Sequence, residues 1–284
     1  MKFRVINLIL MLLCGFCIGL YLFPKESIEI RYIDSNELAV TFENDDTISI
    51  KGINHRGYST EAPENTLAAF KLSKAYGFTY VETDVSFTLD DVPVLLHDQT
   101  INRTSNGIGR ISKMTYKQVL QYDFGSWKGK QFKGEKIPTL EEFLILCKDI
   151  GLKPYIEFKK GATKSQILSA LEIVKKADIA DQVTYISFDT LVCKWIAEKE
   201  PYARIGVLAQ KNYSSIITFI KKISTKDNYV FADIKSIDEK TINKFQKAEI
   251  PVEVWTINNK ATIQELNSYI SGVTSDIIDA EMIR

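Results

Sequence analysis

Residues 53–98 read INHRGYSTEAPENTLAAFKLSKAYGFTYVETDVSFTLDDVPVLLHD and contain both histidines of the chain, His55 and His97. Each histidine ends a short apolar run, where a strand would deliver its side chain to the rim of a sheet. Glu82 and Asp84 stand two apart in a strand-like run, so we expect both carboxylates on the same face. Burying two like charges is costly unless a cation lies between them, and a divalent metal is the usual partner.

From residue 48 onward, strand-like and helix-like segments alternate, which predicts a parallel sheet covered by helices. The candidate central strands number about nine, one more than a closed barrel needs, so one of them should be an edge piece. An open doubly wound sheet also fits the alternation, but no glycine-rich phosphate fingerprint follows the first strand. The expected strands cover residues 48–54, 79–85, 93–96, 152–158, 183–188, 204–209, 229–234, 252–257 and 273–278. The expected helices cover residues 65–76, 139–150, 164–176, 191–198, 214–223, 238–248 and 261–269.

Five short motifs follow one another along the chain. They are HRG at 55–57, PENT at 63–66, ETD at 82–84, HD at 97–98 and EFK at 157–159. In this order they resemble the glycerophosphodiester phosphodiesterases, from residue 51 to the C-terminus. The resemblance implies an α/β fold, a (β/α)8 TIM barrel, in which active residues collect at the C-terminal ends of the strands. Residues 100–136 interrupt the alternation, which predicts a small insertion after the third strand, where the family carries a similar segment beside its active site.

The resemblance also implies how the site would handle an anionic phosphodiester. Glu82, Asp84 and Glu157 are the expected metal ligands, since carboxylate oxygens suit a divalent cation such as Ca²⁺ or Mg²⁺. Arg56 and Lys159 are the expected phosphate-binding residues, because a guanidinium can donate two parallel hydrogen bonds and an ammonium adds a point charge. These five residues should therefore share one pocket.

Proton transfer and the substrate pocket have their own candidates. His55 and His97 are suited to general acid and base roles near neutral pH. Water could attack phosphorus directly, or a neighbouring substrate hydroxyl could attack first and form a cyclic phosphate; the sequence leaves both routes open. Trp127, Phe188 and Trp255 could line the substrate pocket. The alternative is that Trp127 pins the inserted loop and that Phe188 and Trp255 belong to the core.

These residues together predict metal-dependent hydrolysis of glycerophosphodiesters to sn-glycerol 3-phosphate and an alcohol. A phospholipase or a glycerol-phosphate polymer hydrolase of the same fold is the alternative, and a barrel that only binds is a third interpretation. Lys+Arg 36 equals Asp+Glu 36, so no basic field indicates nucleic acid as a partner. We expect a small-molecule substrate and no obligate protein partner.

The amino terminus, residues 1–24, predicts a membrane anchor or a signal segment. Lys2 and Arg4 introduce an apolar run that reaches residue 23 and is interrupted only by Asn7, nearly long enough to cross a bilayer. No small-residue cleavage pattern follows, which favours an anchor at the cell membrane over secretion after cleavage. The basic start should stay cytoplasmic, leaving the catalytic domain outside. Residues 25–49 are expected to form a tether or a β-hairpin, and residues 50–284 the barrel.

Overall fold

The computed structural model describes residues 50–223, 227–259 and 269–276, together with Thr262 and four short strands before residue 50. These short strands form two antiparallel pairs, β1 with β2 and β3 with β4. They are β1 (Tyr32–Asp34), β2 (Glu37–Leu38), β3 (Val40–Thr41) and β4 (Thr47–Ile48). The expected anchor at 1–24 lies outside the described residues, as does nearly all of the helix expected at 261–269. Within the described part, no helix combines the length and the apolar character needed to span a membrane.

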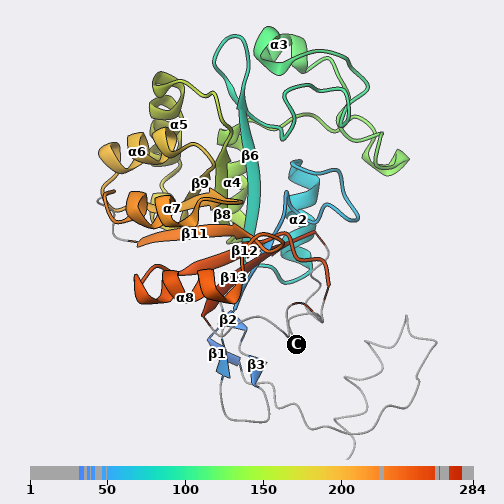
Figure 1. Cartoon of the computed structure of the whole chain (residues 1–284). Coiled ribbons are helices and arrows are strands. Elements are labelled where there is room, and N and C mark those ends of the chain that lie inside the picture. Colours follow the sequence, from blue (N-terminus) through green and yellow to red (C-terminus); the bar gives the residue numbers. More distant parts are fainter. Residues whose placement is uncertain are drawn as a thin grey trace, which may run out of the picture.

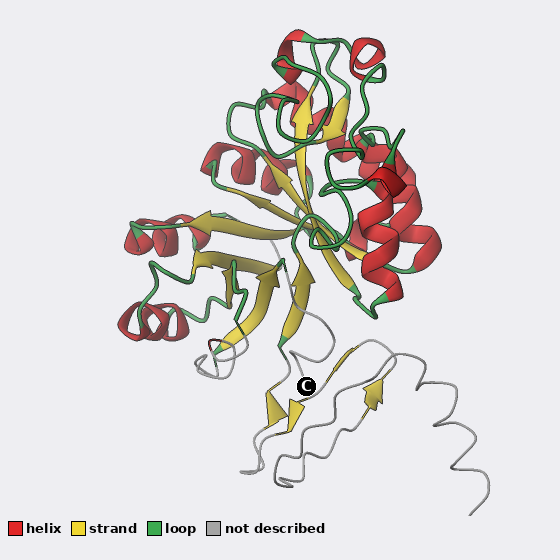
Figure 2. Cartoon of the chain, turned by 90° about the vertical axis from the view of Figure 1, so that its right-hand side faces the viewer, coloured by secondary structure: helices red, strands yellow, loops and turns green. Residues whose placement is uncertain are grey.

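Eight parallel strands of the described chain close into a barrel, with helices on its outer side (Figures 1 and 2). Around the ring the order is β5-β13-β12-β11-β10-β9-β8-β6, and the pairing of β6 with β5 closes it. The strands are β5 (Lys51–Asn54), β6 (Tyr80–Phe87), β8 (Lys153–Phe158), β9 (Thr184–Ser187), β10 (Arg204–Ala209), β11 (Asp227–Asp233), β12 (Val252–Trp255) and β13 (Ile270–Ser275). The predicted (β/α)8 barrel is confirmed.

The structure identifies the surplus strand and shifts the bounds of the last one. The surplus strand is β7 (Pro93–Leu95), which pairs antiparallel with β6 outside the ring, so the expected edge piece is found there. The last strand begins at residue 270 and not at 273, because β13 pairs with β12 from Ile270, opposite Val252, and with β5 as far as Ser275, opposite Asn54. The sequence placed it too late because the apolar residues that follow Asp276 extend the strand-like pattern.

Short polar signals start the helices that cover the barrel. Thr139 caps α4 in a capping box with Glu142, and Thr163 with Gln166 does the same for α5. Gly151 ends α4 in the left-handed conformation, at φ 70°. The helices are α2 (Leu67–Ala75), α4 (Leu140–Ile150), α5 (Lys164–Ala177), α6 (Thr190–Lys199), α7 (Tyr213–Ile220) and α8 (Glu239–Lys247).

The insertion lies between β7 and α4 and has a small core of its own. It contains η1 (Ile111–Lys113), α3 (Tyr116–Val119) and η2 (Lys130–Phe132), and Figure 1 shows it as a green lobe above the barrel. Burial of apolar side chains holds it together without long helices or strands. The buried residues of this core are Val94, Leu96, Ile101, Ile111, Val119, Phe124 and Ile137.

The barrel interior is filled by side chains along most of its length. Ile53, Tyr155, Ile186, Leu208 and Phe231 form a buried cluster inside the ring. This is the expected state of an eight-stranded barrel, which is a packed core and not a pore. Any cavity must therefore lie at one end of the strands.

Gly206 on β10 gives a test of this packing. A Cβ added there would lie 2.6 Å from Cδ2 of Phe231 and 2.9 Å from Cγ2 of Ile186. We therefore expect Gly206→Ala to lower the free energy of unfolding by about 1–3 kcal/mol through overpacking, measured by urea denaturation. Lys221→Ala, at an exposed position, should change it by less than about 0.5 kcal/mol. Equal stability of the two variants would contradict the tight packing around Gly206.

Candidate active site

Three buried carboxylates meet on two neighbouring strands. Glu82 and Asp84 lie on β6 and Glu157 lies on β8, with Asp84 opposite Glu157 in the strand register. One oxygen from each residue lies within 4.8 Å of the others. The described part of the chain therefore has a buried acidic cluster that could hold a metal ion.

The charges around this cluster show how well a cation would fit it. Burial and the charge of Asp84 raise the pKa of Glu82 to about 8 and that of Glu157 to about 7. Burial also disfavours ionised Asp84, but Lys159 and Arg56 outweigh it and hold the pKa of Asp84 low. Lys159 Nζ lies 2.5 Å from Asp84 Oδ1 and 2.8 Å from Glu157 Oε2. The protein's own cations thus compensate Asp84 but leave two carboxyl groups reluctant to ionise, and an additional cation would relieve this.

The turn after β5 presents Arg56 to the cluster. Its backbone is left-handed, at φ 57°, and its N–H donates a 3.0 Å hydrogen bond to Glu82 Oε2. Its guanidinium donates to Glu64 Oε1 at 2.9 Å. Gly57 follows at φ 76°, where a Cβ would lie 2.8 Å from that of Ala69. Only glycine fits here without displacing the backbone of α2, which explains the Arg-Gly pair of the first motif.

The PENT run fixes Asp84 from the other side. Asn65, also left-handed at φ 56°, donates from Nδ2 to Asp84 Oδ2 at 2.8 Å. Its side-chain oxygen accepts from the Thr83 hydroxyl at 2.8 Å and from the Asp84 backbone N–H at 3.2 Å. Thr66 then caps α2. One tight turn therefore starts a helix and orients a carboxylate of the cluster.

Each histidine is held by a carboxylate through Nδ1. The Nδ1–Oδ1 distance is 2.5 Å between His55 and Asp276 and 2.7 Å between His97 and Asp98. Burial lowers the pKa of His55, but Asp276 and Glu82 raise it above its ordinary value. Burial dominates at His97 and holds its pKa below the ordinary value. With Nδ1 engaged, Nε2 is the ring nitrogen left for proton exchange with a ligand.

A cavity of about 160 Å³ joins these groups to an apolar wall. Phe188 and Trp255 lie in that wall with their rings perpendicular and their centroids 5.6 Å apart. The cavity is polar on one side and apolar on the other, as a site for a small organic phosphate would be. The residues that line it are His55, Arg56, Glu82, His97, Glu157, Lys159, Ile186, Phe188, Leu208, Phe231, Trp255, Thr256 and Thr274.

Trp127 does not line this cavity. It lies in the insertion, 40% exposed, and its indole N–H donates to the Phe124 carbonyl oxygen at 2.9 Å. The neighbouring Lys128 donates to the Ser59 carbonyl oxygen at 2.7 Å. These contacts match the alternative considered from the sequence, in which Trp127 pins the inserted loop.

Sequence reasoning gave no role to Arg103 and did not pair Asp276 with His55, although both residues support the site. Asp276 is the partner of His55 and accepts a second hydrogen bond from Asn258 Nδ2 at 2.7 Å. Arg103 and Glu64 form ion pairs beside His97 and Arg56. The signal that could have indicated Asp276 was its place at the C-terminal end of the last barrel strand.

Comparison with known proteins identifies the family. Residues 55–280 match the model of the glycerophosphoryl diester phosphodiesterase family. The chain belongs to this family. Its phosphodiesterase barrel is similar to a phosphodiesterase of Oleispira antarctica in complex with the product sn-glycerol-3-phosphate, with a TM-score of 0.74 and 28% identity. That similarity covers 80% of this chain and 92% of the other.

Two relatives match this chain over nearly their whole length. YhdW of Bacillus subtilis, named provisionally as a glycerophosphodiester phosphodiesterase, is 31% identical over 80% of this chain and 94% of its own. The glycerophosphodiester phosphodiesterase of Caldanaerobacter subterraneus is 28% identical over 79% of this chain and 93% of its own. The phosphodiesterase region thus spans the relatives almost completely.

The acidic cluster predicts how metal and pH act together on stability. Without metal, folded Glu82 and Glu157 retain protons that an unfolded chain would release, so stability should fall as the pH rises from about 5 to about 8. A divalent cation binds the ionised carboxylates. We therefore expect Ca²⁺ or Mg²⁺ to raise the melting temperature more at about pH 8 than at about pH 6, measured against samples in chelator.

Glu82→Gln is the control for this experiment, since it removes one charge and keeps the shape of the side chain. It should reduce the metal-dependent gain at the higher pH. An unchanged melting temperature on adding either metal at both pH values would show that the cluster does not hold a divalent cation.

Proposed function

We propose that this protein is a metal-dependent glycerophosphodiester phosphodiesterase that produces sn-glycerol 3-phosphate and an alcohol. The observation that carries the proposal is a single cavity in which Arg56 and Lys159 face Glu82 and Glu157, with His55 and His97 on its lining. The product in the complex of the Oleispira antarctica relative supports the same substrate class.

The phosphate would lie at the polar side of the cavity. Arg56 and Lys159 offer hydrogen-bond donors and positive charge to its oxygens. Glu82, Asp84 and Glu157 would hold one divalent cation, Ca²⁺ or Mg²⁺, which when bound polarises a phosphoryl oxygen and offsets its charge. The protein residues thereby reduce the electrostatic repulsion that keeps nucleophiles away from a phosphodiester.

The histidines would move the protons of the reaction. One ring accepts the proton of the attacking oxygen while the new P–O bond forms, and the other donates a proton to the alcohol oxygen as the old P–O bond breaks. The attacking oxygen belongs either to water or to a hydroxyl of the substrate's glycerol, which would give a cyclic phosphate that water then opens. Asp276 and Asp98 would hold each ring through Nδ1 and direct Nε2 to these transfers; Nε2 of His55 lies 3.9 Å from Glu82 Oε2.

The glycerol or alcohol moiety would contact the apolar side. Phe188 and Trp255 are the residues we assign to this wall, together with Leu208 and Phe231, which also line the cavity. A glycerol-3-phosphate unit presents both a charged end and a carbon backbone, so a cavity with one polar and one apolar side suits it. Trp127 has no part in this assignment.

A chelator-controlled assay tests the proposal directly. Purified full-length protein should hydrolyse glycerophosphocholine with added Ca²⁺ or Mg²⁺ and lose that activity in excess chelator. His55→Ala and His97→Ala should each lower kcat by at least about a hundredfold, because each removes a proton-transfer group. Glycerol 3-phosphate release in a coupled assay is the measurement.

Trp127→Phe is a matched aromatic control and should stay within about threefold of the wild-type kcat/KM, since Trp127 lies outside the cavity. Near-normal rates in either histidine variant would defeat the assignment of that ring. Preferential hydrolysis of micellar phospholipid or of a glycerol-phosphate polymer would show that this molecule, and not the small diester, is the substrate.

We also propose that residues 1–24 anchor the protein in the cell membrane, with the phosphodiesterase domain on the extracytoplasmic side. The support is the basic start followed by an apolar run of nearly membrane-spanning length. Expressed in bacterial cells, the full-length chain should enter the membrane fraction and be digested by protease added to spheroplasts. A variant that starts at residue 25 should remain in the soluble fraction. Recovery of the full-length chain as a soluble, protease-protected protein would refute the anchor.

A further inference from the structure

Arg103 makes an unusually complete set of charged contacts for a side chain outside the catalytic cavity. It belongs to the insertion, and its side chain is 45% exposed. Nε and Nη2 donate to the two oxygens of Asp98 at 2.8 and 3.1 Å. Nη1 and Nη2 donate to the two oxygens of Glu64 at 2.6 and 2.8 Å. All three guanidinium nitrogens are therefore used, and both carboxylates are held in the two-pronged manner that fixes orientation.

Each of the two carboxylates that Arg103 holds also contacts a residue that lines the catalytic cavity. Asp98 Oδ1 also contacts Nδ1 of His97 at 2.7 Å, and Glu64 Oε1 also accepts from Nη1 of Arg56 at 2.9 Å. A continuous chain of charged groups thus runs from His97 through Asp98, Arg103 and Glu64 to Arg56. Its two ends are residues of the catalytic cavity, and its centre is a residue of the insertion.

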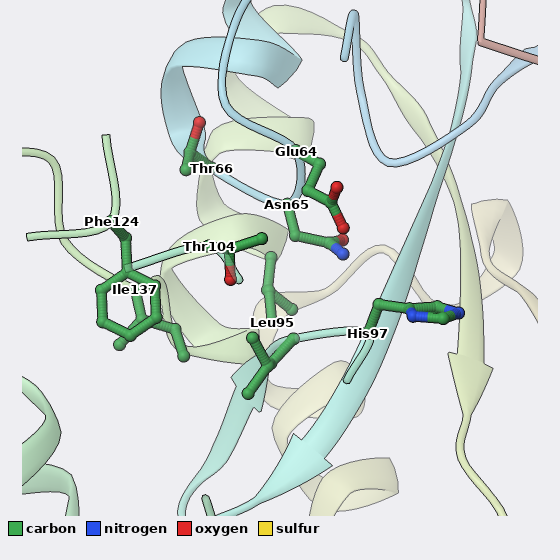
Figure 3. A pocket seen from close by; sticks show the side chains of 9 residues that line it. Glu64, Asn65, Thr66, Leu95, His97, Thr104, Phe124 and Ile137 are labelled. Carbon is green, nitrogen blue, oxygen red and sulfur yellow. The ribbon is translucent and has the colours of Figure 1, made fainter. Parts of the chain in front are cut away.

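The segment around Arg103 is closely packed against the barrel. The next residue, Thr104, is buried, and Figure 3 shows it beside Glu64, Asn65 and His97 around a small cavity. That cavity has a volume of about 10 Å³, about enough for a single water. In Figure 3 the imidazole of His97 points away from Phe124 and Ile137. Close packing here leaves little room to absorb a shift, so movement at Arg103 would reach His97.

We propose that Arg103 is a positioning residue, which orients His97 through Asp98 and Arg56 through Glu64 and so couples the insertion to catalysis. This inference rests on the proposed phosphodiesterase function. An isolated exposed ion pair would contribute little, but two carboxylates gripped by one planar guanidinium restrict the rotation of both. Lysine cannot reproduce this arrangement, because its ammonium is a point charge.

Steady-state kinetics test the coupling. Arg103→Met should lower kcat by about 10- to 100-fold, because a displacement of His97 misaligns proton transfer, and should raise KM through Arg56. Arg103→Lys should recover only part of this loss. Asp98→Asn should add little in the Arg103→Met background, because the two residues act as one unit.

Arg110→Met is the matched control, since this exposed arginine of the same insertion hydrogen bonds Gln99 and has no ion pair among the described residues. It should keep the wild-type kcat and KM. Melting temperature and metal-dependent stabilisation should stay near wild type in the Arg103 variants, which separates positioning from loss of fold. Should Arg103→Met fail to fold, Arg103→Lys carries the same test.

A second measurement does not depend on activity. The chain has two histidines, so long-range ¹H–¹⁵N spectra contain two imidazole rings, and His55→Gln assigns them. Wild-type His97 should show the single tautomer protonated at Nδ1, and Arg103→Met should show a mixture of tautomers. An unchanged His97 signal, wild-type kcat in Arg103→Met, or additive losses with Asp98→Asn would each overturn the proposal. If the wild type lacked phosphodiesterase activity but the tautomer shifted, the proposed function would fail and the positioning role would stand.

Discussion

Repulsion among three buried carboxylates is the constraint on which the rest of the site depends. Glu82, Asp84 and Glu157 converge to within 4.8 Å in a region where burial alone already disfavours charge. An arrangement of this kind is destabilising in isolation and persists in proteins where it serves a function. The surrounding groups follow from it, because Arg56 and Lys159 compensate Asp84 while Asn65 and the Arg56 backbone N–H fix the carboxylate orientations.

Most helices and strands could be predicted from the sequence because the patterns that indicate them are local. Period-two and period-3.6 patterns and the capping box at Thr139 depend on residues a few positions apart, and most predicted elements differ from the observed ones by only one to three residues. The closure of the barrel and the exclusion of β7 from the ring depend on pairing between distant strands. A pattern of single residues does not contain that pairing, so the surplus strand could be counted but not identified.

The same distinction explains what was and was not foreseen at the site. Glu82 and Asp84 share a strand face by periodicity, and the family motifs supplied Glu157 and the histidines. Asp276 meets His55 across 221 positions of sequence, and it does so only because the last strand closes the ring next to the first. The sequence left two roles open for Trp127, because a glycine-flanked loop gives no information on the direction of its side chain, and the structure places it outside the cavity lining.

The insertion has a different relation to the site from that of the barrel strands. The strands place functional groups directly, since their C-terminal ends converge at one rim. The insertion contributes no residue to the cavity lining, yet Arg103 reaches the partners of both His97 and Arg56. Strand register therefore fixes the position of the carboxylates, while a loop residue holds the carboxylates that contact His97 and Arg56. In this protein the carboxylates on the strands are the part of the site that the sequence predicts best, whereas the pair of Arg103 with Glu64, 39 positions apart, is not encoded by local patterns.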